Sequence, residues 1–165
     1  MNRFGPEARE NRPLSMRYEF KLGNILLYVA TTLMLIGGIG DVLFTYINPG
    51  MIPSHLDFLN IQEAEASPKL IALTHSMLRA IGGLLIALAI GSFFLLYFRK
   101  SVSKIGATLV VTLIILIGEG NNAWQMYMVE SPLFWYPLSI CIISLVGLVL
   151  AYFGERNSER PKTTG

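Results

Sequence analysis

The apolar run from Leu70 to Phe98 constrains the fold of this chain more than any other stretch. About 20 helical residues cross a bilayer, and this run is longer, so it predicts a transmembrane helix. His75 and Arg79 lie one helical turn apart within it and therefore share a face. Ionisable residues inside a span are costly and usually face the interior of a bundle. We therefore expect partner helices to pack against this face.

Three further apolar runs complete the set, so the predicted spans cover residues 22–47, 70–98, 105–127 and 133–153, with polar tails at 1–21 and 154–165. The composition agrees, since 53% of the 165 residues are hydrophobic and only 15% are charged. This balance is typical of a membrane protein. A signal peptide is the alternative for the first run, but that run continues to span length and lacks an A-x-A-like site. The sequence predicts an all-α integral membrane protein, a bundle of four transmembrane helices.

The distribution of lysine and arginine predicts the orientation of the bundle. The N-terminal tail, the loop after the second span and the C-terminal tail hold eleven of these residues, whereas the two opposite loops hold only Lys69. Cytoplasmic loops carry the excess of basic residues in membrane proteins. We therefore expect both termini in the cytoplasm, with residues 48–69 and 128–132 outside.

Local signals mark the helix ends. Pro49-Gly50 and Pro53 end the first helix, and the segment HLDFLNI (55–61) predicts a short amphipathic turn on the membrane surface. Ser67 followed by Pro68 is typical of a helix start, and Ser103 can cap the third span.

Polar residues gather at similar depth in three of the spans. At 1.5 Å per residue, the four ionisable ones lie roughly 7–13 Å inside the end of the bundle opposite the termini. The candidate set consists of Asp41, His75, Arg79, Glu119, Asn122 and Gln125. We expect Arg79 to pair with Asp41 or Glu119, because four separate ionisable groups in lipid would oppose insertion.

Small residues favour that arrangement. Gly37, Gly38 and Gly40 precede Asp41, and Gly82 and Gly83 follow Arg79, so both helices can be approached closely. The first three spans should meet around the polar cluster, and the fourth should close the bundle.

Two structural explanations compete with a functional site. His75 can be an interfacial residue while Arg79 extends its long side chain to the headgroups, and Asp41 can do likewise. Alternatively, the cluster is a salt-bridge network without a ligand. Glu119, within IGEGNNAW, is the residue that these alternatives explain least well.

Other chemistries are poorly supported. A haem held between helices needs two histidines at matching depth, but His55 lies in a loop. A single cysteine, Cys141, excludes an internal disulfide and multi-cysteine metal sites. The loop residues His55, Asp57, Glu63 and Glu65 fit no recognised metal spacing, so we predict no metal. No Walker-type loop is present, and no basic stripe indicates a nucleic-acid partner.

The segment MLRAIGGLLIALAIG (77–91) resembles the corresponding helix of small four-helix bacterial membrane proteins grouped as DoxX-like, in which an arginine precedes a glycine pair. Arg79, Gly82 and Gly83 carry the resemblance, together with the preceding PSHLDFLN. It implies a bundle in the bacterial inner membrane, which in some relatives is associated with quinone-linked redox partners. It implies no catalytic residues.

The leading functional hypothesis is a binding or accessory protein whose outward-facing polar pocket accepts a quinone or a lipid-like molecule. Arg79 would hold a carbonyl or anionic group, Glu119 would fix Arg79, and His75 would exchange a proton. A second hypothesis is a membrane enzyme with Glu119 and His75 as acid and base. A third is a structural subunit that contacts lipids and either another membrane protein or a second copy of itself.

Overall fold

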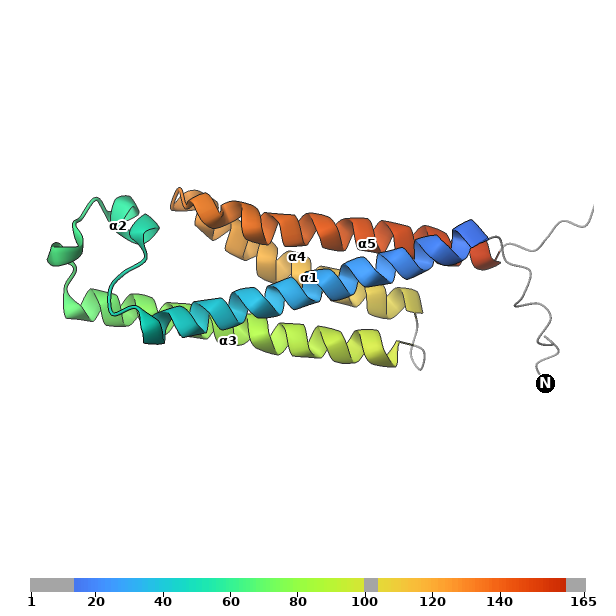
Figure 1. Ribbon diagram of the computed structural model, residues 1–165, viewed down its shortest axis with the longest axis horizontal. Coiled ribbons are helices and arrows are strands. Elements are labelled where there is room, and N and C mark those ends of the chain that lie inside the picture. The colour runs from blue at the N-terminus through green and yellow to red at the C-terminus, as the bar shows by residue number, and fades with distance from the viewer. Residues whose placement is uncertain (1–13, 100–103, 160–165) are drawn as a thin grey trace, which may run out of the picture.

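The computed structural model describes residues 14–99 and 104–159, and all regular secondary structure in those ranges is helical (Figure 1). The elements are α1 (Leu14–Ile47), α2 (Pro53–Leu59), η2 (Glu63–Glu65), α3 (Pro68–Phe98), α4 (Lys104–Met128), η3 (Pro132–Phe134) and α5 (Trp135–Glu159). Four helical segments are long and apolar enough to cross a membrane, namely Lys21–Ile47, Pro68–Phe98, Lys104–Met128 and Pro132–Gly154. The predicted all-helical bundle with four candidate spans is confirmed.

The helices extend further than the predicted spans at the end where the chain begins and finishes. α1 begins at Leu14 rather than Leu22, and α5 continues to Glu159 rather than ending at Phe153. No glycine or proline between Leu14 and Leu22 interrupts the first helix. An apolar run in the sequence marks only the part of a helix that can lie in lipid. The helix itself can continue beyond that run.

α1 is the central helix of the bundle. It packs extensively against both α3 and α5, and α4 packs mainly against α5 (Figure 1). We call the end that carries α2 and the α4–α5 turn the loop end. The opposite end, with Lys21, Arg99 and Lys104, is the basic end.

Two predicted local signals are confirmed near the loop end. Ser67 Oγ accepts a hydrogen bond from the Leu70 amide at 3.2 Å, with Pro68 in the first turn of α3. The predicted turn is present as the helix α2, which ends at Asn60 in the left-handed conformation with φ 52°. Its place on the membrane surface stays a prediction. The predicted cap Ser103 lies outside the described residues.

Close backbone approach explains how α1 packs. A Cβ atom on Gly38 would lie 2.7 Å from the Gly82 carbonyl oxygen, and one on Gly82 would lie 2.6 Å from that of Gly38. Gly40 and Gly83 differ, since a Cβ there would have no described atom within 4 Å. Only part of the predicted glycine set therefore forms the α1–α3 contact.

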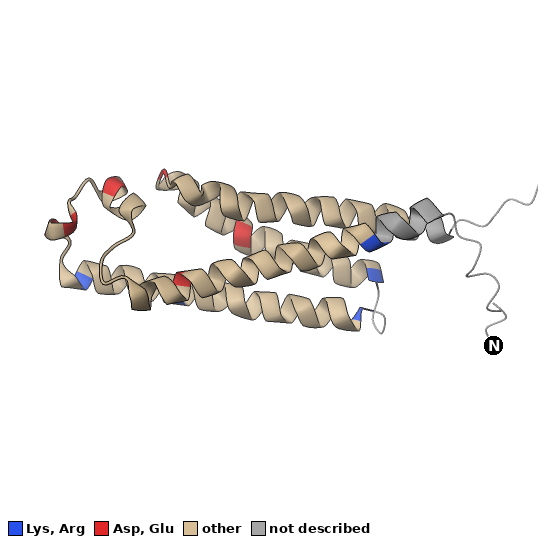
Figure 2. Ribbon diagram, in the orientation of Figure 1, with Lys and Arg blue, Asp and Glu red and all other residues tan. Residues whose placement is uncertain are grey.

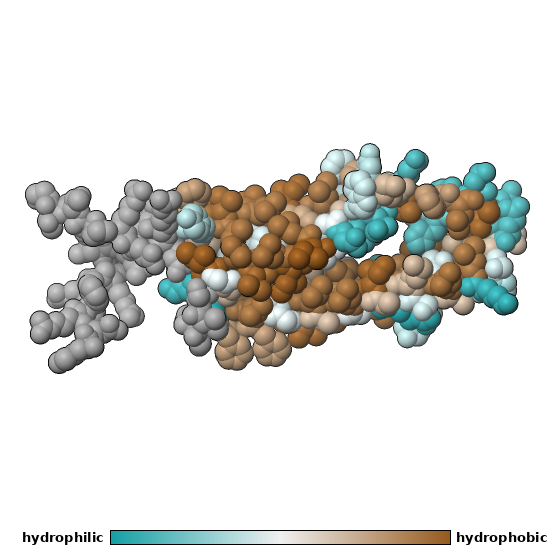
Figure 3. Space-filling view, turned by 180° about the vertical axis from the view of Figure 1, so that it is seen from behind, coloured by the Kyte–Doolittle hydropathy of each residue, from teal (hydrophilic) through white to brown (hydrophobic). Residues whose placement is uncertain are grey.

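Around an apolar core, the bundle presents an apolar exterior, as lipid requires. Leu27, Met34, Leu85, Val111 and Ile140 are among the core residues. Figure 3 shows a broad hydrophobic band between the two ends. Figure 2 shows the described charges mainly at the ends of the bundle, with acidic positions also marked within α1 and α4.

Candidate functional site

Glu119 is the most deeply buried ionisable residue of the described chain. Its side chain on α4 is 1% exposed, and Asn122 Nδ2, one turn further along, donates to Glu119 Oε2 at 3.4 Å. The other carboxyl oxygen, Oε1, is buried and has no hydrogen-bond partner among the described residues. Buried polar atoms are almost always paired, so an unpaired carboxyl oxygen requires an explanation.

Asp41 approaches Glu119 from α1. It is half-buried and lies within range of an electrostatic interaction with Glu119. Its position depends on Gly82 of α3, because a Cβ on that glycine would lie 3.0 Å from the Asp41 Cβ. The close α1–α3 contact therefore packs the base of the Asp41 side chain against α3.

Tyr136 of α5, which is not among the predicted site residues, completes the arrangement. Its hydroxyl donates to the Leu33 carbonyl at 2.6 Å, and its ring covers Gly37, where a Cβ would lie 3.1 Å from a ring carbon. It interacts electrostatically with both Glu119 and Asp41. The only signal in the sequence was Gly37, whose missing side chain makes room for the ring. Asp41, Glu119, Asn122 and Tyr136 together form what we call the acidic site.

Arg79 does not belong to the acidic site, which corrects the predicted pairing with Asp41 or Glu119. Its side chain is exposed and makes no ion pair within the described residues. The guanidinium carbon lies 5.8 Å from the centroid of the Tyr46 ring, within cation–π distance. Helical side chains lean towards the N-terminus, which for α3 is the loop end. Arg79 therefore extends towards that end, as the snorkelling alternative expects.

His75 is buried but binds the connecting loop. Its Nε2 lies 2.8 Å from the Gly50 carbonyl oxygen, and its ring meets Phe44 edge-on with centroids 6.4 Å apart. Gly118, beside Glu119, packs against Leu85 of α3. Ten residues along α3 separate Leu85 from His75, or roughly 15 Å. The structure thus does not bring Glu119 and His75 together as an acid–base pair.

The remaining candidates lie apart from the acidic site or serve local structure. Gln125 is exposed. His55 on α2 is half-buried, and burial lowers the pKa of its imidazole from the ordinary 6.5. Within residues 14–99 and 104–159, no group of three or more His, Cys, Asp or Glu side chains is arranged to hold a metal ion.

Comparison with models of known protein families, with curated proteins and with solved structures finds no match. The resemblance to DoxX-like proteins therefore stays a prediction. The class that the fold itself defines is a multi-pass membrane protein, because four of its helices can cross a membrane.

Proposed function

We propose that the protein binds a small amphipathic molecule, quinone-like or lipid-like, at the acidic site. The observation that carries this proposal is the buried, unpaired Glu119 Oε1. Leaving such an atom without a partner costs about 1–3 kcal/mol. A ligand that donates a hydrogen bond to Oε1 recovers that free energy, so the folded protein would bind it in preference to remaining empty.

The side chains at the acidic site favour a hydrogen-bond donor as the polar end of the ligand. Carboxyl oxygens of Glu119 and Asp41 are acceptors when ionised, and the Tyr136 hydroxyl already donates to Leu33. A quinol hydroxyl, or a hydroxyl or amine of a lipid headgroup, suits this set. Arg79 lies elsewhere, so the expected role in holding a carbonyl or anion is not supported by its position.

A ligand reaches Glu119 only by passing side chains that are half-buried. Asp41 and Asn122 are only partly covered, whereas Glu119 is closed off. Figure 3 shows a hollow towards the loop end, with hydrophilic residues at its rim. We place the polar end of the ligand beside Asp41 and its apolar part among the helices.

We further propose that both termini face the cytoplasm and that the membrane is a bacterial inner membrane. The support for the first is the excess of lysine and arginine in the segments at the basic end. The support for the second is the resemblance to DoxX-like proteins in residues 77–91.

An accessory subunit of a membrane complex is the second candidate function. The exposed guanidinium of Arg79 favours it, because a carboxylate of a partner helix could neutralise that charge within the membrane. Under this alternative, Arg79→Ala releases a co-purifying protein while Glu119→Gln does not. The enzyme hypothesis built on Glu119 and His75 has no such support, since the structure separates the two residues.

Mass spectrometry of small molecules extracted from the purified protein tests the leading proposal. Wild type should retain a stoichiometric quinone or lipid, and Glu119→Gln should lose most of it, because an amide offers a weaker acceptor than a carboxylate. Glu130→Gln is the matched control, since Glu130 is exposed in the α4–α5 turn. Equal retention in both variants, or none in wild type, would reject the acidic site as a binding site.

A further inference from the structure

A groove of about 460 Å³ lies at the α4–α5 turn, at the loop end of the bundle. Along α4 it begins roughly 12 Å beyond Glu119, and it shares no residue with the acidic site. The lining consists of two aromatic residues, one carboxylate and three further residues of the turn: Tyr127, Met128, Glu130, Ser131, Pro132 and Phe134. We call it the turn groove.

Two aromatic rings form adjoining walls of the turn groove. The Tyr127 and Phe134 rings are inclined at 68°, with centroids 6.0 Å apart. Each ring packs against a tryptophan, because the Trp124 centroid lies 6.1 Å from that of Tyr127 and the Trp135 centroid lies 4.3 Å from that of Phe134. The faces of aromatic rings attract cations within about 6 Å, and proteins bind quaternary ammonium groups in this way.

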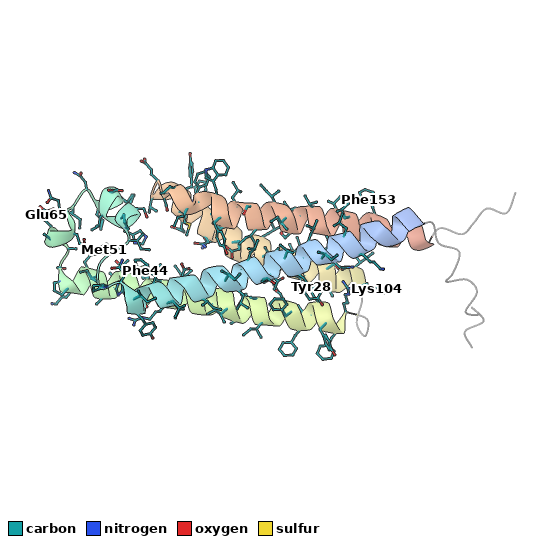
Figure 4. All side chains as sticks on the ribbon, viewed as in Figure 1. Tyr28, Phe44, Met51, Glu65, Lys104 and Phe153 are labelled. Carbon is teal, nitrogen blue, oxygen red and sulfur yellow. The ribbon has the colours of Figure 1, made fainter. Side chains whose placement is uncertain are left out.

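Negative charge lies beside these rings. The Glu130 carboxylate makes no hydrogen bond or ion pair among the residues that the structure describes. The carboxyl end of a helix is electronegative, and α4 has no basic residue in its last turn. The sequence contains no Lys or Arg between Lys104 and Arg156. Figure 4 shows Lys104 at the opposite end of the bundle from the α4–α5 turn.

The backbone at Glu130 is unusual for this residue type. Its φ is 53°, and Asn60 is the other non-glycine residue of the described chain with a positive φ. Glycine or asparagine is the usual residue in this conformation after a helix, because other side chains are unfavourable there. A glutamate at this position costs conformational free energy, and a role for its carboxylate explains why it is present.

We propose that the turn groove binds a water-soluble quaternary ammonium compound, with the cation between the Tyr127 and Phe134 rings and beside the Glu130 carboxylate. A quaternary ammonium donates no hydrogen bond, so aromatic walls suit it better than they suit a primary amine. A choline lipid fits less well, because its phosphate lies close to the ammonium group. That phosphate would meet the same negative charge, with no Lys or Arg in this part of the sequence to bind it.

Tryptophan fluorescence of the full chain in a neutral maltoside detergent tests this proposal. The chain has two tryptophans, and both pack against the rings of the groove. Titration with choline chloride should change the emission and saturate, whereas sodium chloride at equal ionic strength should not. Dimethylbutanol, the neutral isostere in which carbon replaces the nitrogen, should bind about tenfold more weakly, because it lacks the charge that the rings and Glu130 attract.

Two pairs of variants separate the charge from the rings. Glu130→Gln should weaken choline binding about two- to fivefold, whereas Asp57→Asn, which removes an exposed carboxylate from α2, should leave it unchanged. Tyr127→Leu should weaken binding by about the same factor, and Phe58→Leu is its control, because the two rings are 59% and 60% exposed. Glu119→Gln should leave choline binding unchanged, which separates this proposal from that for the acidic site.

Four results would overturn the proposal. The first is the absence of a saturable change with choline, and the second is equal or tighter binding of dimethylbutanol, which would make the groove merely apolar. The third is an unchanged midpoint in both Glu130→Gln and Tyr127→Leu. The fourth is tighter binding of dihexanoyl phosphatidylcholine than of choline, since a lipid headgroup would then be the occupant.

Discussion

At the scale of single residues, Glu119 of the acidic site lowers the stability of the folded protein. Glu119 is 1% exposed with one oxygen unpaired, and its bond from Asn122 is long at 3.4 Å. Buried carboxyl groups of this kind are costly without full hydrogen bonding. A protein retains such a group when function requires it, at some cost in stability.

Replacement of Glu119 by leucine should therefore stabilise the protein once ligand has been washed out. We expect Glu119→Leu to raise the free energy of unfolding by about 1 kcal/mol, because it removes the unpaired oxygen while keeping the volume. Thermal unfolding in detergent measures this. A loss of stability would instead indicate that Glu119 forms a structural network.

His55 predicts a pH dependence in α2. Burial lowers the pKa of His55 below 6.5, so the folded loop binds fewer protons than the unfolded one between the lowered pKa and 6.5. The contribution of neutral His55 to the stability of the folded loop is fully present above about pH 6.5, and it is lost as the pH falls through the pKa of the folded state. Hydrogen exchange of the α2 amides should therefore speed up on acidification beyond its intrinsic pH dependence. The same measurement on His55→Gln should show no such excess, and an unchanged excess would contradict the assignment.

At the scale of helices, the α1–α3 contact determines where Asp41 lies. The crossing depends on Gly38 and Gly82, whose backbones leave no room for a side chain. Their neighbours Gly40 and Gly83 face open space, although the sequence places all four beside ionisable residues.

This difference predicts opposite results for adjacent glycines. Gly82→Ala should destabilise the protein by about 1–3 kcal/mol, since its Cβ would overlap the Gly38 carbonyl. Gly83→Ala should be neutral or slightly stabilising, because alanine favours a helix over glycine. Thermal unfolding of the two variants side by side provides the measurement, and equal destabilisation would contradict the α1–α3 packing.

The sequence predicted the elements better than the site. Hydropathy located the spans, and Ser67 with Pro68 located the start of α3, because these signals act locally. The predicted pairing of Arg79 with Asp41 or Glu119 was wrong, since the depth of a residue along its helix does not determine which neighbouring side chain it contacts. Tyr136 was overlooked because its contact with Leu33 depends on the pairing of α1 with α5, which no local pattern encodes.

At the scale of the whole molecule, cysteine labelling tests the proposed topology, because the chain has a single native cysteine. Cys141 is buried, so the background of thiol labelling should be low. Glu63→Cys, at the loop end, should react with a membrane-impermeant maleimide in intact cells. Ser158→Cys, in the C-terminal segment, should react only after the cells are permeabilised. The reverse pattern would invert the proposed orientation of the bundle.

The most direct test of the central claim is an experimental structure of the wild-type protein extracted with its native lipids. We predict density for an elongated molecule whose polar end lies within hydrogen-bond distance of Glu119 Oε1. A structure in which that oxygen instead binds another side chain of the protein, such as Arg79, would contradict the claim and make the cluster a structural network.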